Sequence, residues 1–337
     1  MAEEGRNVTD AVLRDASATT TGVSSRAAVL RRLRLSDTVF HGLTRAAAFT
    51  VLALLSGVII SLVIGAWPAL STYKFSFFAT EDWNPVTEKF GALAPIYGTL
   101  VTSFIAMAIA VPIGLMVAFF LTELCPMALR RPIGIAIELL AGIPSIIYGI
   151  WGLFVFAPFL QQHIQPFLID VFGNIPVLGT IFEGPPYGIG MLTAGLILAI
   201  MVLPFVTSIS RDVFDAVPPV LKEAAYGVGC TTWEVFRNVI LPYTRVGVIG
   251  GFMLGLGRAL GETMAVTFVI GNAHHISASI LAPGTTISAS IANEFTEAVG
   301  DLYTSSLIAL GLILFFITFI VLSIARLMLM RMQRRAG

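Results

Sequence analysis

Six long apolar segments constrain this chain more than any other feature of its sequence. They cover residues 46–67, 93–121, 133–160, 188–210, 246–272 and 304–328. Each is longer than the roughly 17–20 residues that a membrane-spanning helix needs. Only 12% of the 337 residues are charged, about half the share of roughly 25% that soluble domains carry. The sequence therefore predicts an all-α integral membrane protein with six transmembrane helices.

The basic residues segregate along the chain and predict its orientation. If the N-terminus is inside, the segments 1–45, 122–132, 211–245 and 326–337 are cytoplasmic, and they hold 17 of the 20 Lys and Arg residues. Cytoplasmic loops of membrane proteins carry an excess of these residues. We therefore expect both termini to be cytoplasmic.

The N-terminal tail, residues 1–45, divides into two parts. Residues 1–25 are rich in Ala, Ser, Thr and charge, which predicts disorder. Residues 29–47 place apolar side chains at helical spacing with arginines between them, which predicts an amphipathic helix on the inner leaflet. A simple positive-inside anchor is the alternative.

A spaced motif lies in the expected cytoplasmic loop 211–245. It reads Glu223-Ala224-Ala225, three residues, Gly229, nine residues, and then Val239-x-Leu241-Pro242. This pattern resembles the EAA loop by which permease subunits of bacterial ABC importers dock onto their ATPase, with Val239 in place of the usual Ile. The resemblance implies that all seven of these residues couple the chain to a separate ATPase. An ordinary helical hairpin between two spans is the alternative.

The residues around the motif predict its local structure. Pro218-Pro219 suits the first turn of a short helix, and Gly227 and Gly229 permit a sharp turn after it. Thr231 and Glu234 have the spacing of a capping box that opens a second helix, and we expect Pro242 to close that helix. The loop is thus predicted to be a short helix braced by a second one.

No ATP site is expected in the chain itself. A phosphate-cradling loop ends in Gly-Lys-Ser/Thr, whereas Tyr73, Glu88 and Leu221 precede the three lysines. We therefore expect a transport subunit that is not an enzyme, with no cofactor of its own, no catalytic residue and no metal ligands. ATP would be used by a partner chain. His274-His275 is expected to be a polar loop tip.

Two charged residues fall inside the fifth apolar segment. Arg258 lies about twelve residues into it, near mid-bilayer, where a charge costs at least ~2.5 kcal/mol and must face protein or water. Glu262 is expected on the same helical face, together with the closely spaced Gly247, Gly251 and Gly255. Two interpretations stay open. The pair is a mutually satisfied ion pair, or Arg258 forks onto a tetrahedral oxyanion and Glu262 holds Arg258 when the anion is absent.

A third charge and a proline occur in the third apolar segment. Glu138 is interpreted as an interfacial or packing carboxylate, with a pairing to Arg258 as the alternative. Gly142-Ile143-Pro144-Ser145 is expected to kink the helix.

Four segments together extend the resemblance over about residues 46–330. They are residues 96–99 (IYGT), 137–145 (IELLAGIPS), 226–234 (YGVGCTTWE) and 257–272. In combination they resemble the PstC permease family of high-affinity phosphate ABC importers. The resemblance implies the type I ABC importer permease fold, a place in the bacterial cell membrane, and ATP-driven translocation of inorganic phosphate. It also implies a role for Arg258 and Glu262 in phosphate passage.

The resemblance further implies a set of partners and a division of the chain. The partners are a PstA-type permease that completes a heterodimeric pore, two PstB-type ATPase subunits and a PstS-type phosphate-binding protein, with no nucleic acid. The domains are then the tail 1–45, the permease domain 46–328 with its coupling loop, and a basic C-terminus, 329–337. The outer loop between Trp67 and Trp83 is expected to contact the binding protein.

Two other functions stay open. A secondary anion transporter would explain Arg258 and Glu262 but not the motif in loop 211–245. A membrane subunit that senses phosphate supply is compatible with the first interpretation.

Overall fold

The computed structural model describes residues 4–173, 175–176 and 178–334, with side chains from residue 37 to residue 331 apart from 174, 177 and 178. The chain divides into two units, residues 1–61 and residues 62–337. The described residues are mostly helical, which confirms the predicted fold class.

The α-helices follow one another with few long connections. They are α1 (Glu4–Tyr73), α2 (Ser76–Ala79), α3 (Leu93–Phe119), α4 (Met127–Gly142), α5 (Ser145–Trp151), α6 (Ala157–Phe159), α7 (Gln165–Phe172), α8 (Leu178–Ile181), α9 (Met191–Asp215), α10 (Pro219–Gly227), α11 (Thr232–Val235), α12 (Leu241–Leu260), α13 (Met264–Val269), α14 (Ile287–Glu294) and α15 (Asp301–Arg334). Wider π-helical turns extend several of them: η1 (Phe120–Leu124), η2 (Gly152–Phe156), η3 (Leu160–Ile164) and η4 (Phe236–Ile240). Two short strands, β1 (Trp83–Asn84) and β2 (Lys89–Phe90), pair antiparallel with Trp83 opposite Phe90.

Six helices in the described part of the chain are long and apolar enough to cross a membrane, as predicted. We number them spans 1 to 6: Asp37–Tyr73, Leu93–Leu124, Ser145–Phe172, Met191–Asp215, Thr232–Leu260 and Asp301–Arg331. Spans 1, 2, 4 and 6 contain the predicted segments or differ from them by a few residues. Spans 3 and 5 differ by about twelve residues at each end.

The third span begins later than predicted. Helix α4 ends at Gly142, and α5 begins only at Ser145, because Ile143 and Pro144 have extended backbone. The proline ring removes a donor and disfavours helical geometry for the residue before it. The expected kink is therefore a complete break, and the predicted start at residue 133 is wrong.

The fifth span begins and ends earlier than predicted. The helix that opens at Thr232 continues through η4 into α12, so Pro242 lies in the first turn of α12 and does not close a separate helix. The helix then ends at Leu260, and α13 begins at Met264. Gly261 lies in the break, and glycine is a poor helix former. Hydropathy alone could not show this break, because the residues on both sides of it are apolar.

Helix α1 contains much of the predicted tail. It is helical from Glu4, so the disorder predicted for residues 1–25 is wrong for the described part of that segment. The segment is continuous with the apolar part of α1, and a helix that has once nucleated extends by one hydrogen bond per added residue. The amphipathic character of residues 29–47 stays a prediction, because the side chains before Asp37 lie outside the described residues, as do residues 1–3 and 335–337.

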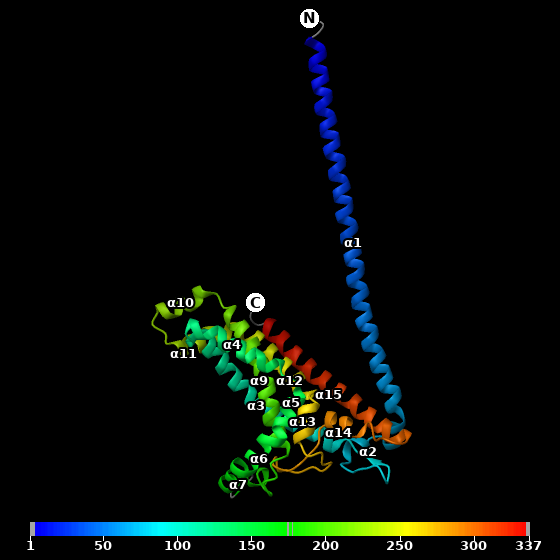
Figure 1. The fold of residues 1–337 in the computed structure, drawn as a ribbon, viewed down its shortest axis with the longest axis vertical. Coiled ribbons are helices and arrows are strands. Elements are labelled where there is room, and N and C mark those ends of the chain that lie inside the picture. The colour runs from blue at the N-terminus through cyan, green and yellow to red at the C-terminus, as the bar shows by residue number, and fades with distance from the viewer. Residues whose placement is uncertain (1–3, 174, 177, 335–337) are drawn as a thin grey trace. The chain divides into compact units, whose positions relative to one another are not determined.

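Helix α9, which forms span 4, lies at the centre of the unit of residues 62–337. It is the most buried of the six spans and packs against α3, α4, α12 and α13. Within this unit, Figure 1 shows α4, α10 and α11 at one end and α2, α6, α7 and α14 at the opposite end. The fold thus places the loop 211–245 at one end of the bundle and the outer loops at the other.

Candidate functional site

The hairpin of α10 and α11 forms as the sequence predicts. Helix α10 has its proline in the first turn and ends in a Schellman motif. Cys230 N–H donates to Ala225 O (3.2 Å), and Gly229 N–H donates to Tyr226 O (3.0 Å). Gly229 has a φ of +92°, in the region that favours glycine. The capping box is confirmed, because the side chains and backbone N–H groups of Thr231 and Glu234 bond reciprocally.

The hairpin is largely uncovered by the part of the chain that the structure describes. No residue of α10 is buried, and both Glu223 and Ala224 are exposed. Large apolar side chains are exposed beside them: Val220, Leu221, Tyr226, Val228 and Trp233. Exposed apolar patches of this kind mark protein interaction surfaces. We call these residues, with Glu223 and Ala224, the hairpin face.

Most of the remaining motif residues attach the hairpin to the bundle. Ala225, Val239 and Leu241 pack against a buried cluster that includes Phe119, Phe214 and Phe236, whereas Pro242 is exposed. The cluster joins the ends of spans 2 and 4 to the start of span 5. The seven motif residues are therefore not one surface, since some face outward and others fix the hairpin to the bundle.

Lys222 is a charged residue of the hairpin that the motif does not include. Its Nζ lies 2.6 Å from Oε1 of Glu123 in η1, and both side chains are largely buried. Lys222 and Glu123 are 99 residues apart in the sequence, so only the structure reveals that they form a pair.

Arg258 and Glu262 do not form the expected ion pair. Arg258 is in the last turn of α12, whereas Glu262 lies after the end of that helix, so the predicted common helical face is wrong. In the part of the chain that the structure describes, Arg258 has no ion-pair partner, and its guanidinium lies 4.6 Å from the ring centre of Phe205 on α9. Arg258 is exposed and Glu262 is partly exposed, so both are available to a partner or to a solute.

The three glycines of span 5 pack against α9 as predicted. A Cβ at Gly247 would lie 2.7 Å from Val213, and one at Gly251 would lie 2.8 Å from Ile209. At Gly255 the nearest atom would belong to Val202, at 3.1 Å. The close approach of the two helices places Arg258 directly beside the surface of α9.

Glu138 pairs with another arginine than the one considered. Arg211 Nη2 donates to Glu138 Oε1 at 2.7 Å, and Arg211 also lies 3.6 Å from Asp212. A cavity of about 640 Å³ at this end of the bundle is lined by these residues together with Arg130, Arg131 and Asp215. Glu138 thus pairs with Arg211 and not with Arg258, while its interfacial position stays a prediction.

A partly buried polar cluster lies at the opposite end of the bundle. Glu294 of α14 accepts hydrogen bonds from Trp83 (2.5 Å), His274 (2.7 Å) and Tyr303 (2.7 Å). Burial alone would raise the pKa of the Glu294 carboxyl, but these hydrogen bonds outweigh it and hold the pKa below its ordinary value. The prediction of a polar loop tip is therefore wrong for His274, whose side chain is mostly buried, while His275 is exposed.

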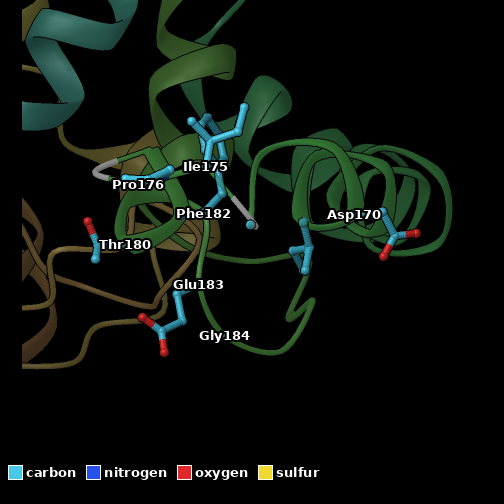
Figure 2. A pocket seen from close by; sticks show the side chains of 10 residues that line it. Asp170, Ile175, Pro176, Thr180, Phe182, Glu183 and Gly184 are labelled. Atoms are coloured by element: carbon cyan, nitrogen blue, oxygen red, sulfur yellow. The ribbon is translucent and has the colours of Figure 1, made fainter.

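A second cavity, of about 630 Å³, lies between α7 and the segment that follows α8. Figure 2 shows the carboxylates of Asp170 and Glu183 on these two segments. The described residues that line the cavity include no basic side chain. Its acidic lining suits a basic partner surface better than an anion.

Six spans with an exposed hairpin at one end define a multi-pass membrane protein, and comparison with known proteins shows its class. Residues 110–334 match the family model of the binding-protein-dependent transport system inner membrane component. The chain therefore belongs to that family and, being 71% identical over 93% of its length to a phosphate transport system permease protein PstC, to the PstC permeases within it. It is accordingly a multi-pass inner membrane protein.

The relatives behind this assignment are similar over nearly their whole length. The phosphate transport system permease protein PstC of Mesorhizobium japonicum is 71% identical over 314 residues, which cover 93% of this chain and 96% of that protein. The protein of the same name from Pasteurella multocida is 59% identical over 301 residues, covering 89% and 94%. The probable PstC of Methanocaldococcus jannaschii is 40% identical over 288 residues, covering 84% and 90%.

A solved structure supports the fold independently. A bacterial alginate ABC transporter, crystallised in complex with an alginate pentasaccharide-bound periplasmic protein, matches with a TM-score of 0.52 at 15% identity. The match covers 82% of this chain and 92% of that one. At this identity the likeness shows the fold alone, and it confirms the expected ABC importer permease fold.

Proposed function

We propose that this chain is the permease subunit of an ATP-driven importer that carries inorganic phosphate across the cell membrane. The hairpin face is the observation that carries the proposal, because its apolar side chains are exposed among the described residues and need a cytoplasmic partner. The phosphate substrate rests on the relatives, which are named phosphate transport system permeases at up to 71% identity. ATP hydrolysis belongs to the partner that docks on the hairpin face.

The partners follow from the same argument. A PstB-type ATPase occupies the hairpin face of this chain, and a second copy occupies the matching loop of a PstA-type permease. A PstS-type phosphate-binding protein delivers the anion to the outer end. The acidic cavity with Asp170 and Glu183 and the exposed Trp67 and Phe75 are at that end and suit such a contact.

The anion route is proposed to pass Arg258. A charged side chain within a span must face protein or water and not lipid, so the exposed guanidinium marks the side of the chain that faces the pore and the second permease. Glu262, in the break between α12 and α13, is placed to repel the anion after Arg258 has bound it.

Both termini are proposed to be cytoplasmic, which puts the hairpin on the side where ATP is found. The two free cysteines, Cys125 and Cys230, are partly exposed near the hairpin end. A membrane-impermeant thiol reagent should label them in inverted vesicles and not in intact cells or right-side-out vesicles. Labelling from outside would refute the orientation.

The decisive experiment is uptake by the reconstituted importer. Proteoliposomes that contain this chain, the second permease and the ATPase should accumulate radioactive phosphate only when ATP is enclosed with the ATPase and binding protein is supplied opposite. Sulfate with the same binding protein is the control anion. Uptake driven by an ion gradient without ATP would instead show a secondary transporter. ATPase binding without any uptake would leave only the sensing function.

A further inference from the structure

The Lys222–Glu123 ion pair is the only ion pair among those formed by described residues that ties α10 to the spans. Lys222 Nζ donates to Glu123 Oε1 at 2.6 Å and lies 3.4 Å from the carbonyl oxygen of Phe214. Glu123 is in η1, at the end of span 2, and Phe214 is in the last turn of α9, at the end of span 4. One ammonium group thus connects the hairpin to two spans.

The surroundings make this connection stiff. The side chains of Lys222 and Glu123 are only 18% and 8% exposed, and a buried pair is screened by salt much less than a surface pair. The ring of Phe236 packs against Phe119 and Phe214 beside it, with ring centres 4.3 and 5.5 Å apart. In contrast, the neighbouring Glu223 is exposed.

From this geometry we infer that Lys222 and Glu123 transmit the movement of the docked ATPase from α10 to spans 2 and 4. Lys222 is then a positioning residue of the transport cycle, distinct from the hairpin face that binds the ATPase. Glu123 lies in the π-helical turn η1, at the end of span 2, and π-helical turns are frequent at functional sites. The inference rests on the proposed function, since it assumes that an ATPase docks on the hairpin face.

The test uses the complete importer in proteoliposomes. Three quantities are measured for each variant: the ATPase that co-purifies, the ATP hydrolysis stimulated by loaded binding protein, and the phosphate taken up per ATP hydrolysed. Lys222→Met should keep the ATPase attached but lower uptake per ATP at least several-fold. Lys222→Arg keeps the charge and several donors, and it should retain most of the coupling.

A double variant separates transmission from mere stability. Lys222→Met leaves the Glu123 carboxylate buried without its partner, which is destabilising by itself. Lys222→Met with Glu123→Met removes that unpaired charge, so the yield of the complex should recover while uptake per ATP stays low. Arg130→Met is the matched control, because Arg130 pairs with Asp215 of α9, next to Phe214, whereas Lys222 is itself in α10. It should leave uptake per ATP near the unmodified level.

Three results would contradict the inference. Normal uptake per ATP in the double variant would show that the pair is only structural. An equal loss in Arg130→Met would show that any charge removed near this end of α9 has the same effect. Failure of the unmodified importer to take up phosphate with ATP would refute the proposed function and this inference together, and it is distinguished by involving no substitution.

Discussion

Gly229 offers a test of the hairpin in which backbone geometry is the only variable. Gly227 and Gly229 lie two residues apart, and a Cβ built on either would meet no atom within 4 Å. They differ in conformation, because Gly227 ends α10 whereas Gly229 has a φ of +92°. Alanine at the two positions therefore adds the same methyl group to open space in two different backbones.

The two substitutions are expected to affect the stability of the hairpin differently. A residue with a Cβ in the left-handed region costs roughly 1–2 kcal/mol, so Gly229→Ala should strain the Schellman turn that orients α10. Gly227→Ala should be neutral or stabilise α10 by up to ~1 kcal/mol, since alanine is the better helix former. If the ATPase needs the native turn, a cost of one or two kcal/mol corresponds to about 5- to 30-fold weaker docking.

The assay is a binding titration of the ATPase on the purified permease pair. Gly229→Ala should shift the titration to higher ATPase concentration, with Gly227→Ala at or below the unmodified value and similar membrane insertion for both. Equal affinities for the two variants, or weaker binding for Gly227→Ala, would refute the reasoning that the turn at Gly229 positions the docking face.

Three further predictions address the span, the packing and the outer end. Arg258→Ala should abolish phosphate uptake while ATPase attachment and complex yield persist. Arg258→Lys should recover part of the uptake, because lysine keeps the positive charge but lacks the forked guanidinium. A lowered yield of the complex with Arg258→Ala would indicate a structural role. Gly98→Ala would place a Cβ 1.9 Å from Thr285 O and should destabilise the complex by about 1–3 kcal/mol or more, seen as a lower melting temperature than for Gly250→Ala, where the Cβ meets nothing. Because hydrogen bonds hold the pKa of Glu294 below its ordinary value, its contribution to stability is complete above pH ~4.3 and is lost as the pH falls through the lower folded-state pKa. Glu294→Gln should therefore flatten the acid end of a melting-temperature profile, and an unchanged slope would contradict this.

The sequence by itself determined the features that depend on neighbouring residues. Uninterrupted hydropathy locates six spans because a bilayer of fixed thickness demands a fixed length of apolar helix. The capping box of Thr231 and Glu234, the turn at Gly229 and the close packing of Gly251 were predictable because local geometry and small size decide them. Spans 3 and 5 were misplaced because Pro144 and Gly261 end helices without changing the apolar character of the segment.

Only the tertiary structure decided which distant residues meet. Lys222 with Glu123, Arg211 with Glu138, and His274 with Glu294 pair across connections that carry no local signal, since helix packing brings them together. Arg258 and Glu262 are only four residues apart in sequence, yet the end of α12 divides them. A charge finds its partner through the arrangement of whole helices, and that arrangement depends on the entire buried surface and not on any single segment.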